Sequence, residues 1–401
     1  MGTLSNAWAV LRRGGPVPFL RAVAERLGPP DSPSLVDYET ARTVDYAAGH
    51  PAVLNPIALP AGPLTVAWIM SPPGEGSGGH QNIFRFIRYL EGAGHTAKVY
   101  LHDMEAAYTE RAIAERLSSS SYAKVAASIE NLTPAGVSSD VDVIIATGWE
   151  TAYMSWIDPS PARRLYFVQD FEPYFYKIGT ETVLAENTYR FGFLGLTAGG
   201  WLADKLSTEF GMPTRSYNFS ADRADYNYVN AEPRKEIFFY ARPGTTRRGF
   251  ELGIMALDTF SRERPDYTIN LAGSDVARYR IPFAYNNLGS MPVTELNALY
   301  NRCAAGLVVS LTNMSLLPLE LLASGVIPVV NDAPNNTMVS SNPFIEYSPA
   351  SPRALADRLI AVVERADLVE HSLKASQSIG PDGWDESGRQ FVQAFESSVR
   401  G

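Results

Sequence analysis

The sequence of 401 residues has little cysteine and little histidine. It contains a single cysteine, Cys303, and five scattered histidines. One cysteine excludes an intrachain disulfide and a zinc site built from several thiolates, and it fits a reducing compartment. The scattered histidines argue against a histidine-rich metal cluster, so we expect neither a metal site nor a bound cofactor.

The sequence also lacks an excess of basic charge and any long apolar run. Its formal net charge is −9 at pH 7, whereas nucleic-acid binding usually needs a basic surface, so we expect no nucleic-acid partner. No apolar run approaches the roughly 18–20 residues of a membrane span. Residues 1–30 show no continuous apolar segment of the secretory type. These absences favour a soluble, cytoplasmic protein.

Hydrophobic residues make up 45% of the chain and charged residues 19%, which is ordinary for a globular protein. The length predicts two domains. Residues 1–60 differ from the rest, with a Gly-Gly-Pro turn at 14–16 and apolar residues mixed with arginines. Two interpretations stay open: a helical extension packed on the main body, and an amphipathic basic helix at the inner face of a membrane. The turn favours the first because it shortens any helix.

From residue 63 onward, apolar runs of strand length alternate with helical spacing. The clearest runs are 64–70, 97–101, 141–146 and 164–168 in the first half, and 236–240, 268–272, 305–309 and 327–330 in the second. This alternation is typical of parallel sheets covered by helices on both faces. We therefore predict an α/β fold with two doubly wound domains, 61–225 and 236–380. Residues 381–401 are expected to form a terminal helix.

A glycine-rich segment, residues 74–79, lies between the first strand and its helix. Glycines let backbone N–H groups approach a phosphate, and the N-terminus of the helix adds partial positive charge. With Asp103 at the end of the next strand, the pattern allows a dinucleotide site. However, Ser71-Pro72-Pro73 separates the strand from the first glycine. We therefore favour another phosphate or sugar contact, with Gly78 and Gly79 as the candidates.

Asp140 and Asp142 form an Asp-x-Asp pair of the kind found in metal-dependent sugar transferases. The pair precedes its apolar strand instead of following it. We interpret it as the solvated start of a strand and not as a metal site.

Asp170 and Glu172 come just past the end of the apolar run 164–168. In open α/β sheets, this edge faces the ligand crevice. Aromatic neighbours suit stacking on a sugar. Together with His80, these carboxylates are candidates for positioning an acceptor hydroxyl, and Asp170 is also a candidate general base. The alternative is that both carboxylates cap the next helix.

Two further segments follow strands of the second half. Arg242, Arg247 and Arg248 lie between a strand and a helix, where guanidinium groups would bind phosphate oxygens bidentately. Glu320 lies among leucines on a later helix, where a ribose diol would satisfy its charge. The alternatives are a solvated basic loop and a surface glutamate.

These two segments, in this order, resemble the donor half of GT-B glycosyltransferases of family four. In that family, an arginine at the end of a strand and a following basic residue grip the nucleotide diphosphate, and Arg242 and the pair Arg247 and Arg248 match them. Glu320, followed by Ala-Ser-Gly at 323–325, matches the second part of the family's later signature. Thr312 stands where the first glutamate of that signature is expected. Two alternatives follow for the donor sugar: Asn313 binds its hydroxyls in place of the glutamate, or the donor is a deoxy sugar that needs different contacts.

The segments 78–82 and 168–173 make the chain similar to WsaF-type rhamnosyltransferases, over about residues 60–400. The resemblance implies a GT-B fold and metal-independent, retaining transfer of L-rhamnose from dTDP-L-rhamnose to a saccharide or lipid-linked acceptor in cell-surface polysaccharide synthesis. It also implies that the terminal helix crosses back onto the first domain. The implied donor contacts are Arg242, Arg247, Arg248, Gly78 and Gly79 for the diphosphate, Glu320, Gly273 and Met291 for the nucleoside, and Asn313 and Leu317 for the sugar.

Two other function classes stay open. An NAD-dependent oxidoreductase would use residues 74–79 and Asp103, and it leaves the three arginines unexplained. A non-catalytic sugar-binding protein on the same fold would explain why Thr312 replaces a glutamate. The fold alone does not distinguish among the glycosyltransferase and these two classes.

Overall fold

The computed structural model describes residues 36–74, 77–102, 109–120 and 122–400. Internal contacts divide the chain into two units, residues 1–43 and 44–401. In the first unit, helix α3 (Tyr38–Thr43) follows Asp37, whose Oδ1 accepts a hydrogen bond of 2.9 Å from the backbone N–H of Thr40. Most of the predicted N-terminal extension, including the candidate amphipathic helix, lies outside the described residues.

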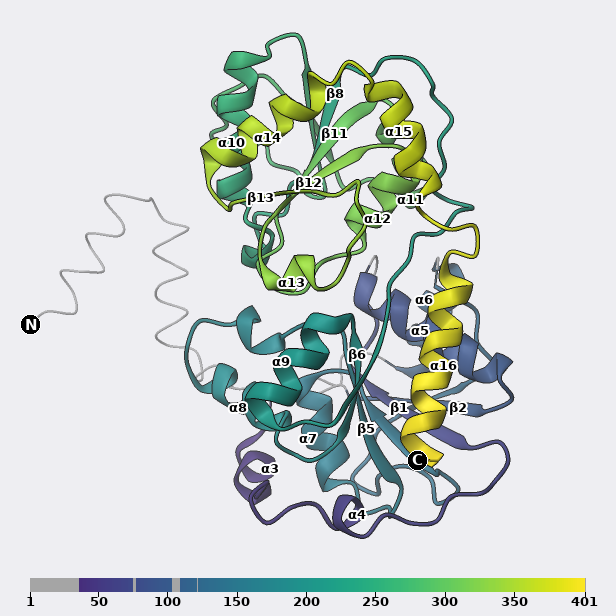
Figure 1. The fold of residues 1–401 in the computed structure, drawn as a ribbon. Helices are drawn as coiled ribbons and strands as arrows, with labels where there is room; N and C mark the ends of the chain where they lie inside the picture. Colours follow the sequence, from purple (N-terminus) through teal and green to yellow (C-terminus); the bar gives the residue numbers. More distant parts are fainter. Residues whose placement is uncertain (1–35, 75–76, 103–108, 121, 401) are drawn as a thin grey trace, which may run out of the picture. The chain divides into compact units, whose positions relative to one another are not determined.

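The second unit contains two parallel sheets. The first has seven strands in the order β3-β2-β1-β4-β5-β6-β7 (Figure 1). Its strands are β1 (Thr65–Met70), β2 (Thr96–Leu101), β3 (Ser128–Asn131), β4 (Val143–Ala146), β5 (Arg163–Val168), β6 (Leu194–Ala198) and β7 (Thr214–Tyr217). The central strand β4 is buried along its whole length, as its unbroken Val-Ile-Ile-Ala sequence predicts.

Helix α4 (Pro51–Leu54) precedes the first strand of this sheet. The helices between its strands are α5 (Gly78–Gly92), α6 (Glu110–Ser119), α7 (Trp149–Ile157), α8 (Thr180–Thr188) and α9 (Gly200–Phe210), with a 3₁₀ turn η1 (Glu172–Phe175). Helix α5 begins after Ser77, whose Oγ accepts a hydrogen bond of 3.4 Å from the backbone N–H of His80. Such a cap satisfies one of the free amides of the first turn.

The second sheet has six strands in the order β10-β9-β8-β11-β12-β13. Its strands are β8 (Glu236–Tyr240), β9 (Thr268–Ala272), β10 (Asn286–Gly289), β11 (Cys303–Val308), β12 (Ile327–Asn331) and β13 (Glu346–Ser348). Its helical elements are η2 (Thr246–Arg248), α10 (Phe250–Glu263), α11 (Val293–Tyr300), α12 (Leu317–Ala323), α13 (Pro334–Thr337), α14 (Pro352–Val363) and α15 (Leu368–Gln377). Strands β11 and β12 are buried throughout and form the centre of this core.

The last helix, α16 (Trp384–Arg400), packs against β6, β7 and α5 of the first half (Figure 1). The Phe391 ring lies 4.5 Å from that of Phe86 and 5.3 Å from that of Tyr217, between ring centres. At the start of the helix, the guanidinium of Arg85 lies 3.9 Å from the centre of the Trp384 ring. The chain therefore passes between the two halves twice, once before β8 and once before α16.

The predicted α/β fold with two doubly wound parallel sheets is confirmed. The sequence did not indicate β3, β10, β13, α13 or α15, which are short or weakly periodic. Within the part of the chain that the structure describes, no helix combines the length and the apolar character needed to cross a membrane.

The position of α16 depends on Gly388. A Cβ atom at this position would lie 2.4 Å from the Tyr89 ring on α5. We predict that Gly388→Ala lowers the free energy of unfolding by about 1–3 kcal/mol because of this overlap. Chemical denaturation would measure the change, with Gln393→Ala on the exposed side of α16 as the control. An unchanged or raised stability would contradict the close packing, since Ala otherwise stabilises a helix relative to Gly by up to about 1 kcal/mol.

Candidate active site

Several predicted site residues follow strands at the switch point of each sheet. The strand order reverses between β1 and β4 in the first sheet and between β8 and β11 in the second. Ligands of open α/β folds bind beside the carboxyl ends of strands at such points. Gly78 and Gly79 follow β1, the three arginines follow β8, and Thr312 and Asn313 follow β11.

The basic loop after β8 is tied to the loop after β11. Arg248 Nη1 donates a hydrogen bond of 2.9 Å to Ser310 Oγ, and the carbonyl of Arg247 accepts one of 3.0 Å from the N–H of Leu311. Gly249 ends the basic loop with φ at 54°, and a Cβ there would lie 2.4 Å from Val309 Cγ1. Only glycine therefore allows this turn and this approach.

Arg242 lies closer to the strand end, where its Nη1 donates a hydrogen bond of 3.2 Å to the hydroxyl of Tyr240. Burial lowers the pKa of Arg248, although the nearby Asp170 carboxylate opposes this effect. A buried guanidinium stays charged. Removing it from water costs free energy that an anionic ligand would offset. The loop therefore presents cations with the chemistry to hold a diphosphate.

Three asparagines fix the loop after β11. Asn331 exchanges two hydrogen bonds with the backbone of Ser310, at 2.7 and 3.0 Å. Asn335 Nδ2 donates to the carbonyls of Ser310 and Thr312, and Asn336 Nδ2 donates to Ser310 O at 3.1 Å. Our sequence analysis missed these residues. Their signal was the cluster of asparagines directly after the strand 327–330.

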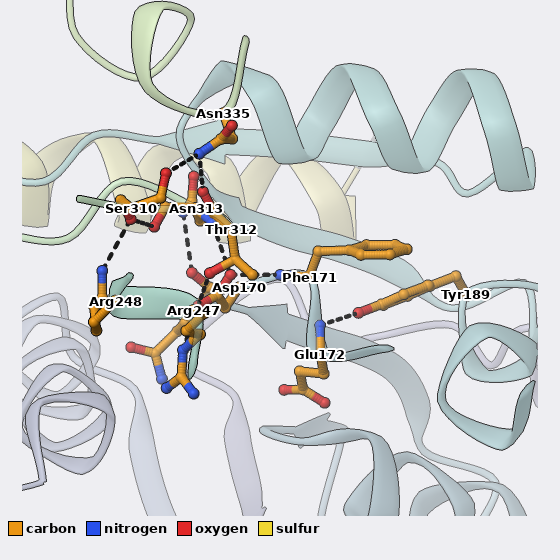
Figure 2. A network of polar contacts seen from close by, with 11 residues as sticks. Asp170, Phe171, Glu172, Tyr189, Arg247, Arg248, Ser310, Thr312, Asn313 and Asn335 are labelled. Carbon is orange, nitrogen blue, oxygen red and sulfur yellow. Dashed lines mark hydrogen bonds and ion pairs between the residues drawn. The ribbon is translucent and has the colours of Figure 1, made fainter. Parts of the chain in front are cut away.

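Asp170, in the first half, contacts this loop of the second half (Figure 2). Its Oδ1 accepts a hydrogen bond of 2.9 Å from the N–H of Asn313, and its Oδ2 accepts one of 3.0 Å from Thr312 Oγ1. Arg247 Nε lies 3.5 Å from Oδ2. Burial raises the pKa of Asp170 above its usual value, although these donors and Arg248 oppose the shift.

Glu172 points elsewhere. Its Oε2 accepts hydrogen bonds of 2.6 Å from the N–H of Trp149 and 3.0 Å from the hydroxyl of Tyr166. The side chain is buried, and burial, together with the neighbouring Glu150 carboxylate, raises its pKa. Glu172 thus caps a helix, as in the alternative interpretation, but the helix is α7, which precedes Glu172 in the chain.

His80 lies in the first turn of α5 beside Gly78 and Gly79. Its Nδ1 lies 2.8 Å from Ser77 Oγ and its Nε2 lies 3.1 Å from the carbonyl of Ser71. Burial lowers its pKa, so the ring is neutral at pH 7. Nε2 then donates to the carbonyl, and Nδ1 accepts from the hydroxyl.

Gln169 joins the first turn of α5 to the second half. Its Nε2 donates to Gly79 O and its Oε1 accepts from Asn82 Nδ2, both at 3.1 Å. Its own carbonyl accepts a hydrogen bond of 3.0 Å from Asn313 Nδ2. Gly79 and Asn313, which the sequence could only place in separate halves, are therefore linked through one residue, Gln169, by its side chain on one side and its carbonyl on the other.

Glu320 lies on α12, which begins at the buried Leu317. Burial raises the pKa of Glu320 to about 7, with Arg85 of the first half lowering it and Asp225 raising it. Gly273 directly follows β9, and its N–H donates to Gly289 O at 2.7 Å. A Cβ at Gly273 would lie 2.7 Å from the Tyr240 ring, so this glycine borders the basic loop.

Other predicted positions fall outside this arrangement. Met291 is partly buried against the core of the second half. The two residues of the Asp-x-Asp pair make structural contacts, as we expected for the start of a strand. Asp142 Oδ2 accepts a hydrogen bond of 2.8 Å from the N–H of Thr65, the first residue of β1, and Asp140 forms an ion pair of 2.9 Å with Lys98. Asp103 and Gly76 lie outside the described residues.

A hollow of about 550 Å³ lies beside the two connections between the halves. It is lined by residues 218–220, 380–383, 386, 387 and 390, and it includes none of the predicted donor residues.

Comparison with known proteins agrees with this arrangement. Residues 235–360 match the family model described as WsaF, C-terminal domain. A glycosyltransferase from Rickettsia africae superposes with a TM-score of 0.57 at 11% identity, over 84% of this chain and 99% of that one. A TarM variant from S. aureus, solved with fondaparinux, α-GlcNAc-glycerol and UDP, gives a TM-score of 0.65 at 9% identity, over 84% and 100%. Residues 235–360 are therefore similar to the C-terminal domain of WsaF, and the chain has the GT-B fold.

A relative from Myxococcus xanthus, the O-antigen biosynthesis protein RfbC, is 38% identical over 202 residues. The match covers 49% of this chain and 16% of RfbC, so the chain spans only a small part of that longer protein. The likeness to the solved structures lies at low identity and shows the fold alone. The match to the WsaF domain spans the basic loop, Thr312 and Glu320.

The raised pKa of Glu320 predicts a pH dependence of stability. The folded protein holds a proton on Glu320 up to about pH 7, whereas the unfolded chain releases it near the ordinary value of 4.5. Stability should therefore fall as pH rises between about 4.5 and 7, by at most about 3 kcal/mol from this group. Glu320→Gln should remove that part of the slope in denaturation measured from pH 5 to 8. Equal slopes in both proteins would contradict the burial of this carboxyl.

Proposed function

We propose that this protein is a glycosyltransferase that moves a sugar from a nucleotide-sugar donor to a glycan or glycolipid acceptor in the synthesis of a cell-surface polysaccharide. The observation that carries the proposal is the set of partly buried arginines at the switch point of the second sheet, inside the region that matches the WsaF C-terminal domain. The name of the relative from Myxococcus xanthus, an O-antigen biosynthesis protein, supports the same class of pathway.

In this proposal, Arg242 and Arg248, with Arg247 beside them, bind the diphosphate of the donor. Negative charge builds up on the diphosphate as its bond to the anomeric carbon breaks, and fixed cations stabilise that charge. The N-terminus of α5, with Gly78 and Gly79, adds amide N–H groups of the kind that bind anions. Glu320 accepts hydrogen bonds from the ribose hydroxyls, with Gly273 and Met291 bordering the nucleoside.

For the donor itself, we propose dTDP-L-rhamnose, transferred with retention of the anomeric configuration. The resemblance to WsaF-type enzymes motivates both points. The Thr312 hydroxyl donates to Asp170, so position 312 offers the sugar no carboxylate of its own. That suits a deoxy sugar, which has fewer hydroxyls to hold, with Asn313 and Leu317 beside it.

On the acceptor side, we propose that His80 helps to position the acceptor hydroxyl. Asp170 and Glu172 would act there indirectly, through the protein groups that their carboxylates hold in place. His80 is neutral at pH 7 and lies at the first turn of α5. Retention without an enzymic nucleophile leaves most of the catalysis to positioning and charge stabilisation. A lipid-linked acceptor would bring the protein to the inner face of a membrane, with residues 1–60 as the contact that we propose.

Ligand-induced stabilisation tests the donor site. At about 100 times its dissociation constant, a ligand adds roughly 2.7 kcal/mol of stability. We predict that dTDP, and not NADH, raises the unfolding midpoint of the protein, and that Arg248→Ala weakens dTDP binding about 10- to 100-fold, as expected for a charge-assisted hydrogen bond. The control is Arg262→Ala, which removes an exposed arginine paired with Asp258 on α10.

Other results of the ligand-stabilisation experiment would change the proposal in specific ways. A shift with NADH alone would replace the proposal with an oxidoreductase, and a shift with UDP or GDP alone would keep the transferase and discard the dTDP donor. Turnover of dTDP-L-rhamnose in the presence of a saccharide acceptor then tests the reaction. Tight dTDP binding without turnover would favour the non-catalytic sugar-binding protein.

A further inference from the structure

The loop after β11 reaches the carboxyl edge of the first sheet. Asn313 Nδ2 donates hydrogen bonds of 3.0 Å to two carbonyls of that edge, Gln169 after β5 and Ala198 at the end of β6. Both Thr312 and Asn313 are buried, at 1% and 2% exposed. A loop of the donor half is therefore held by the acceptor half through main-chain and side-chain groups.

The basic loop takes part in the same contact. Arg247 Nε lies 3.5 Å from Asp170 Oδ2, and its guanidinium carbon lies 4.1 Å from the centre of the Phe175 ring. Asp170 and Phe175 belong to the first half, and Arg247 belongs to the second. We call Asp170, Thr312, Asn313 and Arg247 the clasp (Figure 2).

The oxygens of Asp170 are already occupied by protein donors. Oδ1 accepts from the N–H groups of Phe171, at 2.8 Å, and Asn313, at 2.9 Å. Oδ2 accepts from the hydroxyl of Thr312 and faces Arg247. A general base must offer a lone pair at hydrogen-bond distance from the proton that it removes. The contacts of Asp170 instead match a residue that holds other groups in place.

We propose that Asp170 is a positioning residue that acts through Thr312, Asn313 and Arg247 and fixes the two donor-binding loops against the first half. This inference rests on the proposed transfer of a sugar from a nucleotide donor. Its consequence is that the grip on the diphosphate forms fully only while the halves are together. Thr312 becomes a second positioning residue, although it touches no substrate in this scheme.

A set of isosteric variants tests the clasp through binding of dTDP alone, which involves no chemistry. Asp170→Asn removes the charge, and Thr312→Val removes the hydroxyl. We expect each variant to weaken dTDP binding about 5- to 50-fold. The double variant should bind dTDP about as weakly as the weaker of the two single variants, since both substitutions break the same contact. Thr312→Ser keeps the hydroxyl and should restore binding. The control is Thr337→Val, the same change at an exposed threonine of α13.

A general-base role for Asp170 predicts a different pattern. Asp170→Asn would then lower kcat about 10²- to 10⁴-fold and leave the Kd for dTDP unchanged, and Thr312→Val would behave like the wild-type protein. Additive effects of the two substitutions on dTDP binding would also overturn the clasp, because independent sites add.

Hydrogen exchange of the ligand-free protein separates the clasp from the proposed function. The amide of Asn313 is bonded to Asp170, so we expect Asp170→Asn and Thr312→Val to speed its exchange, while Thr337→Val does not. This result would support the clasp even if no nucleotide bound. Unchanged exchange in both variants would exclude the clasp, whatever the protein's activity.

Discussion

The largely buried carboxylate of Asp170 is the group on which the arrangement of the site depends. A buried charge costs several kcal/mol unless hydrogen-bond donors surround it. One of its donors, the N–H of Phe171, is local, but the Thr312 hydroxyl and the Asn313 N–H come from the other half of the molecule. Separating the halves would therefore expose Asp170 to water and leave the backbone N–H and the Nδ2 group of Asn313 without their partners. The geometry of the loops after β8 and β11 therefore depends on how the two domains pack at Asp170.

The same contact sets the electrostatics of the donor side. Arg247 and Arg248 bring two positive charges to the junction, whereas Asp170 brings one negative charge. Burial strengthens the interactions among them, because charges attract more strongly in a low dielectric. The positive charge left over is what a diphosphate would neutralise. The asparagines at the end of β12 and in α13 hold the loop beside these charges through neutral hydrogen bonds and add no charge of their own.

Local patterns in the sequence predicted part of this structure. The unbroken apolar run of β4 and the position of Arg242–Arg248 after β8 follow from short stretches of chain. The contact of Thr312 with Asp170 joins residues 142 positions apart, and it depends on how the halves approach. The partner of Glu172 could not be predicted either, although it lies in the same half, because it depends on how neighbouring strand connections pack. Its carboxylate bonds the first turn of α7, which lies on a neighbouring strand connection and not next in the chain.

The presence of a threonine at position 312, where the family signature has a glutamate, has a physical explanation. A glutamate at 312 would place a second carboxylate beside Asp170, and like charges at short range in a buried site raise each other's pKa and repel. A threonine at 312 donates to the carboxylate instead. The junction thus keeps one negative charge, which comes from the first half and not from the loop itself. Positions 170 and 312 form one chemical unit, so a change at either position alters what the other must do.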